Sequence, residues 1–212
     1  MQKIMFNDKY GLTQAVLDGR KTQTRRVLNP TMLFKRLKTY EGWSKEDISA
    51  WKRSCKTRLY EAQGAELQQM LDYALLFSRY KIGEEVAVAQ SYRWLGLDRV
   101  RVHNGKEILE IPFSKGWENK MYVKADLMPY RIRITNIRAE RLQDISEEDC
   151  LAEGIVDFES RINKAHFYSI TDESATYGTA KKPYSLLIDK IAGKGTWKNN
   201  PYVFVYDFEL SD

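Results

Sequence analysis

The chain has 212 residues, of which 43 % are hydrophobic, 12 % aromatic and 30 % charged. This composition is typical of a folded protein and argues against a disordered one, and the length suits one domain with a proper core. No apolar run approaches the roughly 20 residues that a membrane-spanning helix needs, so we expect no membrane segment. The first residues also lack the apolar region of a signal peptide, which makes a cytoplasmic location the default expectation.

Positive charge is concentrated in the first 60 residues. Residues 1–30 carry a charge of +4 and residues 31–60 a charge of +5, whereas the whole chain carries +5. The remainder of the chain is therefore acidic overall. This asymmetry predicts an anionic partner, nucleic acid or nucleotide, that approaches the N-terminal part. For residues 31–60 a solvated basic helix surface is the alternative.

Metal-binding and redox residues are scarce in this sequence. Cys55 and Cys150 are far apart, which gives neither a disulfide framework nor zinc-ligand spacing. The only histidines, His103 and His166, lie near no cysteine or carboxylate cluster with ligand spacing. We therefore expect no metal site and no cofactor. The Gly-x-Ser-x-Gly motif of serine hydrolases is also absent from the sequence.

The first 30 residues predict strand, helix and strand in that order. Residues 4–6 are expected to form a short strand, and the spacing of apolar residues predicts an amphipathic helix over 9–18. Gly19 is then expected to end this helix with a positive φ angle. Residues 23–28 are expected to form a second strand, which ends at Asn29-Pro30.

Between that helix and strand lies a dense run of polar groups, Gly19-Arg20-Lys21-Thr22-Gln23-Thr24-Arg25-Arg26. In an extended chain, side chains two residues apart share a face. Lys21, Gln23 and Arg25 would then face away from Thr24, so Lys21 and Thr24 can meet only if the backbone turns between them. The alternative is a solvated basic turn at the cation-favouring end of a helix.

Residues 31–80 are expected to form a helical block. Ser44 is a candidate N-cap for one helix, with Asp47 at the third helical position. The apolar spacing further along predicts one long amphipathic helix over residues 57–80, despite Gly64.

The second half of the chain alternates irregularly between strands and helices. A turn into a strand is expected over 81–89, followed by the polar and aromatic patch 90–94. Residues 130–138 alternate cleanly, apart from one break before Ile137, and predict a half-buried strand with a basic outer face. Further strands are expected at 108–111, 121–124 and 202–210, a turn at Ser114-Lys115-Gly116, and helices at 146–154 and 184–191. This pattern favours an α+β fold with a barrel-like sheet over a doubly wound one.

Four segments together resemble the ASCH domain family. They are Gly19-x-Lys21-x-x-Thr24-x-Arg26, Ile82-Gly83-Glu84-Glu85-Val86, the stretch 141–149 followed by Ala152-Glu153-Gly154, and Trp197-x-x-Asn200-Pro201-Tyr202-Val203-Phe204. The resemblance touches a little over half of the chain. It implies a PUA-like fold, a small β-barrel with flanking helices, as a single domain over 1–212. The helical block at about 31–80 lies outside the resemblance and is expected to be an insertion.

The resemblance also implies an activity. Some small members of the family are amidohydrolases that remove the acyl group from acetylated cytidine, and their catalytic residues fall on Lys21, Thr24 and Glu153. A threonine hydroxyl needs a nearby base, and a lysine can serve when burial or neighbouring cations lower its pKa. Glu153 could then protonate the departing amine or orient water. Without the resemblance, a glutamate near a helix end would be expected to face solvent.

Six further residues are candidates for binding the ligand. Arg20, Arg25 and Arg26 could grip phosphate or lower the pKa of the lysine, and aromatic residues of the 90–94 patch could stack on a base. Longer family members usually carry an acidic residue and a tryptophan where this chain has Gln90 and Tyr92. The ligand candidates are therefore Arg20, Arg25, Arg26, Gln90, Tyr92 and Trp94. Packing of the aromatic residues under the helical insertion is the alternative.

Two functional classes remain open from the sequence. The first is an amidohydrolase that deacylates a nucleoside of the acetylcytidine type in a Lys/Thr/Glu pocket. The second is a non-catalytic module that binds RNA or a nucleotide with the same arginines and aromatic side chains.

Overall fold

The computed structural model describes residues 1–31, 44–96, 99–103, 108–112, 118–160, 162, 164–171 and 175–211, with the backbone alone in 99–103 and 108–112. The expected turn at Ser114-Lys115-Gly116 lies outside the described residues, as does the part of the helical block from 32 to 43.

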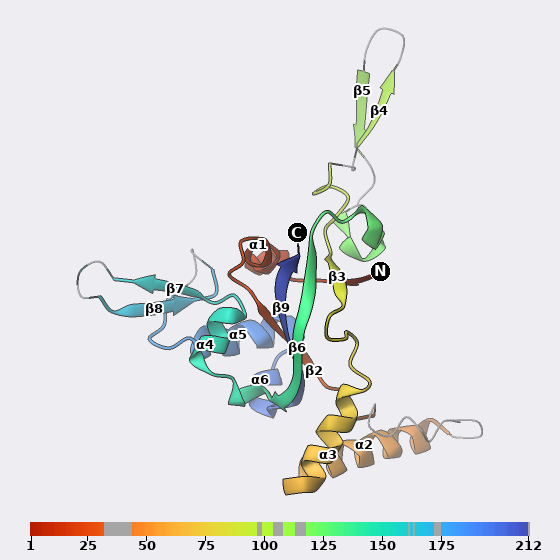
Figure 1. Cartoon of the computed structure of the whole chain (residues 1–212), viewed down its shortest axis with the longest axis vertical. Coiled ribbons are helices and arrows are strands. Elements are labelled where there is room, and N and C mark those ends of the chain that lie inside the picture. Colours follow the sequence, from red (N-terminus) through yellow and green to blue (C-terminus); the bar gives the residue numbers. More distant parts are fainter. Residues whose placement is uncertain are drawn as a thin grey trace.

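The fold is a mixed α+β arrangement around a five-stranded sheet (Figure 1). The strand order is β1-β3-β6-β9-β2. Strands β1 and β3 pair in parallel and the other neighbours are antiparallel. The strands are β1 (Gln2–Ile4), β2 (Gln23–Val27), β3 (Glu85–Val88), β6 (Arg131–Arg141) and β9 (Tyr202–Ser211).

Two hairpins extend this framework. One consists of β4 (Arg99–His103) and β5 (Ile108–Pro112), and the other of β7 (Val156–Glu159) and β8 (His166–Ser169). The β4–β5 hairpin projects from one end of the molecule, and the helices α2 (Lys45–Glu61) and α3 (Gly64–Leu75) lie at the opposite end (Figure 1). Sequence patterns did not predict β4, β7 or β8, which are only four or five residues long, although β4 and β7 alternate between apolar and polar residues.

Helices lie beside the sheet and at one end of it (Figure 1). The α-helices in the described ranges are α1 (Leu12–Leu17), α2 (Lys45–Glu61), α3 (Gly64–Leu75), α4 (Glu147–Ala152), α5 (Lys181–Ala192) and α6 (Thr196–Asn199). Short 3-10 turns are η1 (Asp8–Tyr10), η4 (Lys120–Tyr122), η5 (Ala125–Leu127) and η6 (Leu142–Asp144). None of the helices in these ranges is long and apolar enough to cross a membrane.

Several predicted elements are confirmed. The strand at 23–28, the final strand at 202–210 and the helix at 184–191 correspond to β2, β9 and α5. In β6, Ile132 and Ile134 are buried while Arg133 is exposed, and a register shift between Ile134 and Asn136 accounts for the break in the alternation. Ser44 and Asp47 form a reciprocal capping box at the start of α2.

The prediction of one helix over 57–80 is wrong. Helix α2 ends at Glu61, and Ala62 and Gln63 take extended backbone before α3 begins. Gly64 has a φ of 53°, which lies in the left-handed region that a right-handed helix does not contain. The described part of the block, residues 44–80, therefore contains a pair of helices, anchored to the core by the buried Leu59 and Ala74.

The strand predicted at 121–124 is also wrong. The side chain of Asn119 accepts a hydrogen bond from the backbone N of Met121 and starts the turn η4. The ammonium of Lys3 then gathers three carbonyl oxygens from this segment, those of Lys120 at 3.0 Å, of Met121, and of Val123 at 2.7 Å. Carbonyls that converge on one ammonium cannot alternate as a strand requires.

Two boundaries near the N-terminus also differ from the prediction. Strand β1 begins at Gln2 instead of Ile4. The predicted helix over 9–18 is divided into η1 and α1 by Gly11, whose φ is 65°. Gly19 has the expected positive φ, 72°.

Candidate active site

Lys21 lies between α1 and β2, at the place where the chain turns toward the sheet. Its backbone N donates to the carbonyl of Ala15 at 2.8 Å, so the segment stays against the end of α1. Its side chain is 1 % exposed. The ammonium donates to the carbonyl of Gln23 at 2.7 Å and to both the carbonyl and Oε2 of Glu153 at 2.7 and 2.6 Å. These three bonds use all three donors of the ammonium.

Glu153 reaches Lys21 because α4 ends beside β2. Helix α4 contacts both β2 and α5, and the backbone N of Thr22 donates to the carbonyl of Ala152 at 2.9 Å. Glu153 is the C-cap residue of α4, and Gly154 follows it with a φ of 100°. A Cβ at Gly154 would lie 3.3 Å from Leu12 Cδ2 and 3.5 Å from Lys21 Cδ. The glycine therefore supplies both the turn and the space for the lysine.

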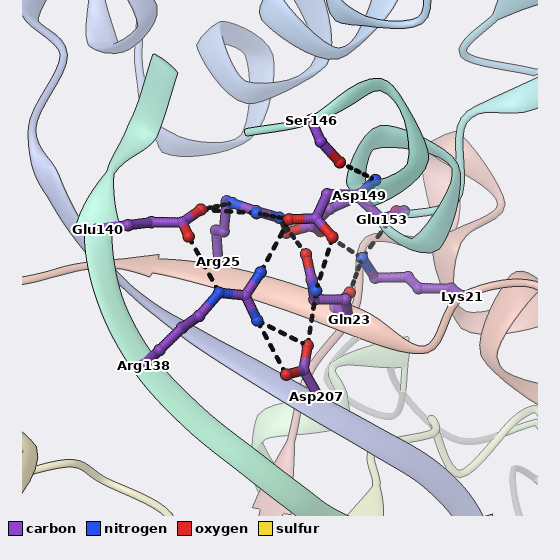
Figure 2. Close-up of polar contacts among 9 residues, drawn as sticks. All are labelled: Lys21, Gln23, Arg25, Arg138, Glu140, Ser146, Asp149, Glu153 and Asp207. Carbon is purple, nitrogen blue, oxygen red and sulfur yellow. Dashed lines mark hydrogen bonds and ion pairs between the residues drawn. The ribbon is translucent and has the colours of Figure 1, made fainter. Parts of the chain in front are cut away.

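Arg25 occupies the centre of a buried polar network (Figure 2). Its side chain is 0 % exposed. Nε and Nη2 donate to Glu140 Oε1 at 3.0 and 2.7 Å, and Nη2 also donates to Asp149 Oδ2 at 2.7 Å. Nη1 donates to Gln23 Oε1 and, at 3.3 Å, to Glu153 Oε1. Five hydrogen bonds match the five N–H donors of a guanidinium.

Arg138 completes the network from β6. It donates to Glu140 at 3.0 Å, to Asp149 at 2.8 Å and to Asp207 at 2.9 and 3.2 Å. Gln23 links the same two aspartates, donating to Asp207 at 2.6 Å and to Asp149 at 3.2 Å. Figure 2 shows these side chains converging from β2, β6, β9 and α4. The cations are Lys21, Arg25 and Arg138, and the carboxylates are Glu140, Asp149, Glu153 and Asp207, so the network carries one net negative charge.

Burial and the neighbouring charges set the pKa values of the two central cations. Burial lowers the pKa of Lys21, the carboxylate of Glu153 opposes this, and Arg26 and Arg25 lower it further. Burial would also lower the pKa of Arg25, but the carboxylates of Glu153 and Glu140 outweigh it and raise the pKa above its usual value. Arg25 is therefore a fixed cation, whereas Lys21 is the group from which a proton is more easily removed.

A cavity of about 250 Å³ opens beside this network, and we call it the Lys21 cavity. Lys21, Thr24 and Glu153 all line it, together with Arg25 and Arg26. Its other walls are mainly apolar and include three side chains of α5. They are Met5, Phe6, Asn7, Leu12, Leu187, Ile188 and Ile191. A small site with apolar walls and a few polar groups suits a small ligand.

The structure thus brings together the three residues predicted to be catalytic. Lys21, Gln23 and Arg25 share the polar network, as their alternation predicts, and the chain bends before β2 so that Lys21 and Thr24 line one cavity. Thr24 lies in β2, pairs with Tyr206 of β9 and is 4 % exposed.

The three arginines differ in their availability. Arg26 lines the cavity, and its Nη2 donates to the carbonyl of Met5 at 2.8 Å. Arg25 also lines the cavity, but carboxylates and Gln23 already use its five donors, so of its two expected roles the geometry favours lowering the pKa of Lys21 over gripping phosphate. Arg20 is half exposed, pairs with Asp18 at 3.5 Å and does not line the cavity, so the structure does not bring it together with the three predicted catalytic residues.

The patch 90–94 does not join this cavity either. Gln90 and Trp94 line a different cavity of about 230 Å³, with Asp8, Thr13 and Lys120 among its other lining residues. Tyr92 packs against a small apolar cluster that contains Val123 and Met128. The ligand candidates therefore do not share one site. Arg25 and Arg26 line the Lys21 cavity, Gln90 and Trp94 line the other cavity, and Arg20 and Tyr92 line neither.

Sequence reasoning missed most of the supporting network. Arg138, Glu140, Asp149 and Asp207 were not singled out, since charged residues on strands and at helix starts are usually exposed. Gln23 offered the one usable signal, because it shares a strand face with Lys21 and Arg25. Tyr184 was also missed. Its hydroxyl is buried without a hydrogen-bond partner in the described part of the chain, and burial raises its pKa well above the usual value.

Comparisons with protein-family models, with curated proteins and with solved structures give no match to this chain. Within the described ranges, no three histidine, cysteine, aspartate or glutamate side chains are grouped so that they could hold a metal ion. A function for this chain can therefore be inferred only from the geometry of the site.

Proposed function

We propose that this chain is an ASCH-like protein that binds a nucleoside or nucleotide in the Lys21 cavity and deacylates N-acetylated cytidine. The observation that carries the proposal is the convergence of Lys21, Thr24 and Glu153 on one cavity, with Lys21 Nζ 2.6 Å from Glu153 Oε2. The fold proposed with it is the PUA-like β-barrel, with the helices α2 and α3 as its insertion.

The polar groups of the cavity suit amide hydrolysis. Thr24 Oγ1 would attack the acetyl carbonyl carbon and pass its proton to the neutral amine of Lys21. When the C–N bond breaks, that proton moves to the exocyclic nitrogen of cytidine, and the acetyl group stays on Thr24 as an ester. Water then cleaves the ester, which releases acetate and restores the threonine.

Lys21 must first lose a proton to act as a base. Its neighbour Glu153 can take that proton across the 2.6 Å hydrogen bond, which leaves a neutral amine and a neutral carboxylic acid. Burial favours this exchange, because both charged forms have lost their hydration. The lowered pKa of Lys21 is consistent with this role.

The test is release of cytidine from N4-acetylcytidine by the purified chain. The variants Thr24→Val and Lys21→Met are expected to lose at least about 100-fold in rate, as the loss of a nucleophile or a general base does. Glu153→Gln should also lose activity, because an amide cannot accept the lysine proton. Thr22→Val is the matched control, since Thr22 is exposed, and it should keep the rate within about twofold.

Two results would contradict the catalytic proposal. One is a rate in Thr24→Val equal to that of the unmodified chain. The other is no release of cytidine by the unmodified chain above the buffer blank. Circular dichroism of each variant separates loss of activity from loss of folding.

A specific observation favours the non-catalytic alternative, RNA binding. A neighbouring cavity of about 310 Å³ shares Met5 and Arg26 with the Lys21 cavity, and Lys3, Arg26 and Arg79 line it without any carboxylate. Tyr80, Phe204 and Tyr206 add aromatic surface. If the chain is an RNA-binding module, its affinity for single-stranded RNA should fall steeply with salt. Replacing the exposed Arg79 by glutamine should then reduce both the affinity and the salt dependence.

A further inference from the structure

A third cavity lies on the other side of the segment that begins α1. This Gln90 cavity has a volume of about 230 Å³. Asn7 and Leu12 face the Lys21 cavity, whereas Asp8 and Thr13 line the Gln90 cavity. The full lining is Asp8, Gly11, Thr13, Gln14, Leu17, Gln90, Ser91, Trp94 and Lys120. None of these residues lines the Lys21 cavity.

Gln90 is an unusual residue within this lining. It follows the end of β3, it is only 1 % exposed, and its backbone N donates to Met128 Sδ at 3.2 Å. In the described residues, neither Oε1 nor Nε2 of its side chain has a hydrogen-bond partner. Buried side-chain amides nearly always have partners, and each exception calls for an explanation. Both atoms are buried beside a cavity that Gln90 lines, so a polar ligand would satisfy this unpaired donor and acceptor once the amide turns toward it.

Other polar groups of the wall already have partners, and Gln14 Nε2 donates to Asp18 Oδ1 at 2.7 Å. The ammonium of Lys120 donates to Thr13 Oγ1 at 2.9 Å, to the carbonyl of Phe6 at 3.3 Å, and to Asp8. The hydroxyl of Ser91 accepts a hydrogen bond from the backbone N of Trp94 at 3.1 Å. The chemistry that the cavity offers to a ligand is therefore mainly that of the Gln90 amide.

The cavity also has an aromatic wall. Trp94 is 49 % exposed, and its ring meets that of Tyr130 edge-on with centroids 5.7 Å apart. The edge contact leaves a face of the indole available for stacking. An amide that pairs with a base edge and an aromatic ring that stacks on the base are the two elements of single-base recognition.

We propose that the Gln90 cavity is a second binding site, which takes one nucleobase that carries an amine next to a ring acceptor. Gln90 Oε1 accepts a hydrogen bond from the exocyclic amine, Gln90 Nε2 donates to the adjacent ring nitrogen, and Trp94 stacks on the ring. Adenine and cytosine both present this paired edge. The site is separate from the Lys21 cavity, so it binds whether or not that cavity is catalytic.

The test is a binding titration of the full chain with adenosine and with purine riboside, which lacks the exocyclic amine. Adenosine should bind about fivefold to tenfold more tightly, the difference expected for one neutral hydrogen bond. Cytidine should bind as adenosine does. Gln90→Met should weaken adenosine binding at least tenfold and remove the preference for adenosine over purine riboside. Trp94→Ala should weaken both ligands at least tenfold, since it removes the stacking surface.

Controls separate this site from the Lys21 cavity. Thr24→Val should leave adenosine binding within about twofold, because Thr24 does not line the Gln90 cavity. Equal affinity for adenosine and purine riboside would overturn the proposal, as would unchanged binding in Gln90→Met or Trp94→Ala. The proposal would also be overturned if neither adenosine nor cytidine bound at millimolar concentration. The partner of Gln90 would then be a buried water. If Gln90→Met fails to fold, two other measurements test the proposal. They are the affinities of adenosine and purine riboside for the unmodified chain, and the affinities of the same ligands for Trp94→Ala.

Discussion

The ammonium of Lys21 and the carboxylate of Glu153 form a buried ion pair across 132 residues of sequence, with Nζ and Oε2 2.6 Å apart. Both side chains are nearly inaccessible, at 1 % and 7 % exposure. Two buried charges are stable only when each is paired and hydrogen-bonded. Lys21 meets this condition with three acceptors, and Glu153 meets it through Lys21 and Arg25.

The burial of Lys21 predicts a pH dependence of stability. Its pKa in the folded protein is below the ordinary value of 10.5, so between these two pH values the unfolded chain binds more protons. The free energy of unfolding should therefore rise with pH in this window and fall as the pH drops to the folded-state pKa. Urea unfolding at several pH values measures this for the unmodified chain and for Lys21→Met. A pH-independent difference between the two would contradict the prediction.

The five hydrogen bonds of Arg25 predict that lysine cannot replace it. An ammonium has three donors and lacks the planar fork, so Arg25→Lys leaves acceptors of Glu140, Asp149 or Gln23 unpaired in a buried site. The expected loss is on the order of 3 kcal/mol in the free energy of unfolding. Arg20→Lys is the matched control, since its pair with Asp18 is half exposed, and it should change stability by less than about 0.5 kcal/mol. Equal effects of the two changes would contradict this assignment.

Gly154 is predicted to tolerate no side chain. Its φ of 100° is strained for other residues, and a Cβ would press on Leu12 and Lys21. Gly154→Ala should lower the free energy of unfolding by about 1–3 kcal/mol and displace the lysine. Gly83→Ala isolates the backbone term, because Gly83 has a φ of 81° and a Cβ there would meet nothing within 4 Å. Thermal unfolding should show a larger loss at Gly154 than at Gly83, and the reverse order would refute the crowding argument.

The unpaired hydroxyl of Tyr184 predicts that its removal is harmless. In the described residues this buried hydroxyl has no hydrogen-bond partner, so Tyr184→Phe removes an unsatisfied group and should stabilise the fold by up to about 1 kcal/mol. The hydroxyl of Tyr206, by contrast, accepts a hydrogen bond from Ser78 at 2.9 Å. Tyr206→Phe should therefore cost about 1 kcal/mol. Chemical denaturation distinguishes the two, and a comparable loss in both would mean that Tyr184 has a partner.

Local patterns in the sequence were sufficient for the elements near the site. Apolar spacing predicted a helix before Gly19, the strand β2 after it, and the alternation of β6 with its break. The same patterns were wrong for 121–124, where Lys3 of β1 gathers the carbonyls of a turn. They were also wrong at Gly64, where a positive φ interrupts an otherwise helical spacing. A hydrophobic period of 2.0 or 3.6 residues indicates the local conformation of one segment. It carries no information on contacts with residues far away in sequence.

Local patterns were thus enough to predict many of the elements and to mark the dense polar run of residues 19–26, and the resemblance supplied the choice of Lys21, Thr24 and Glu153. The packing of the chain was needed to show that carboxylates occupy the hydrogen-bond donors of Arg25 and that Arg20 lies outside the Lys21 cavity. It was also needed to show that Gln90 and Trp94 line a separate cavity. The reason is physical. Whether a charged group binds a ligand or supports the fold depends on which side chains remain beside it once water is removed, and strand order and helix packing set those neighbours.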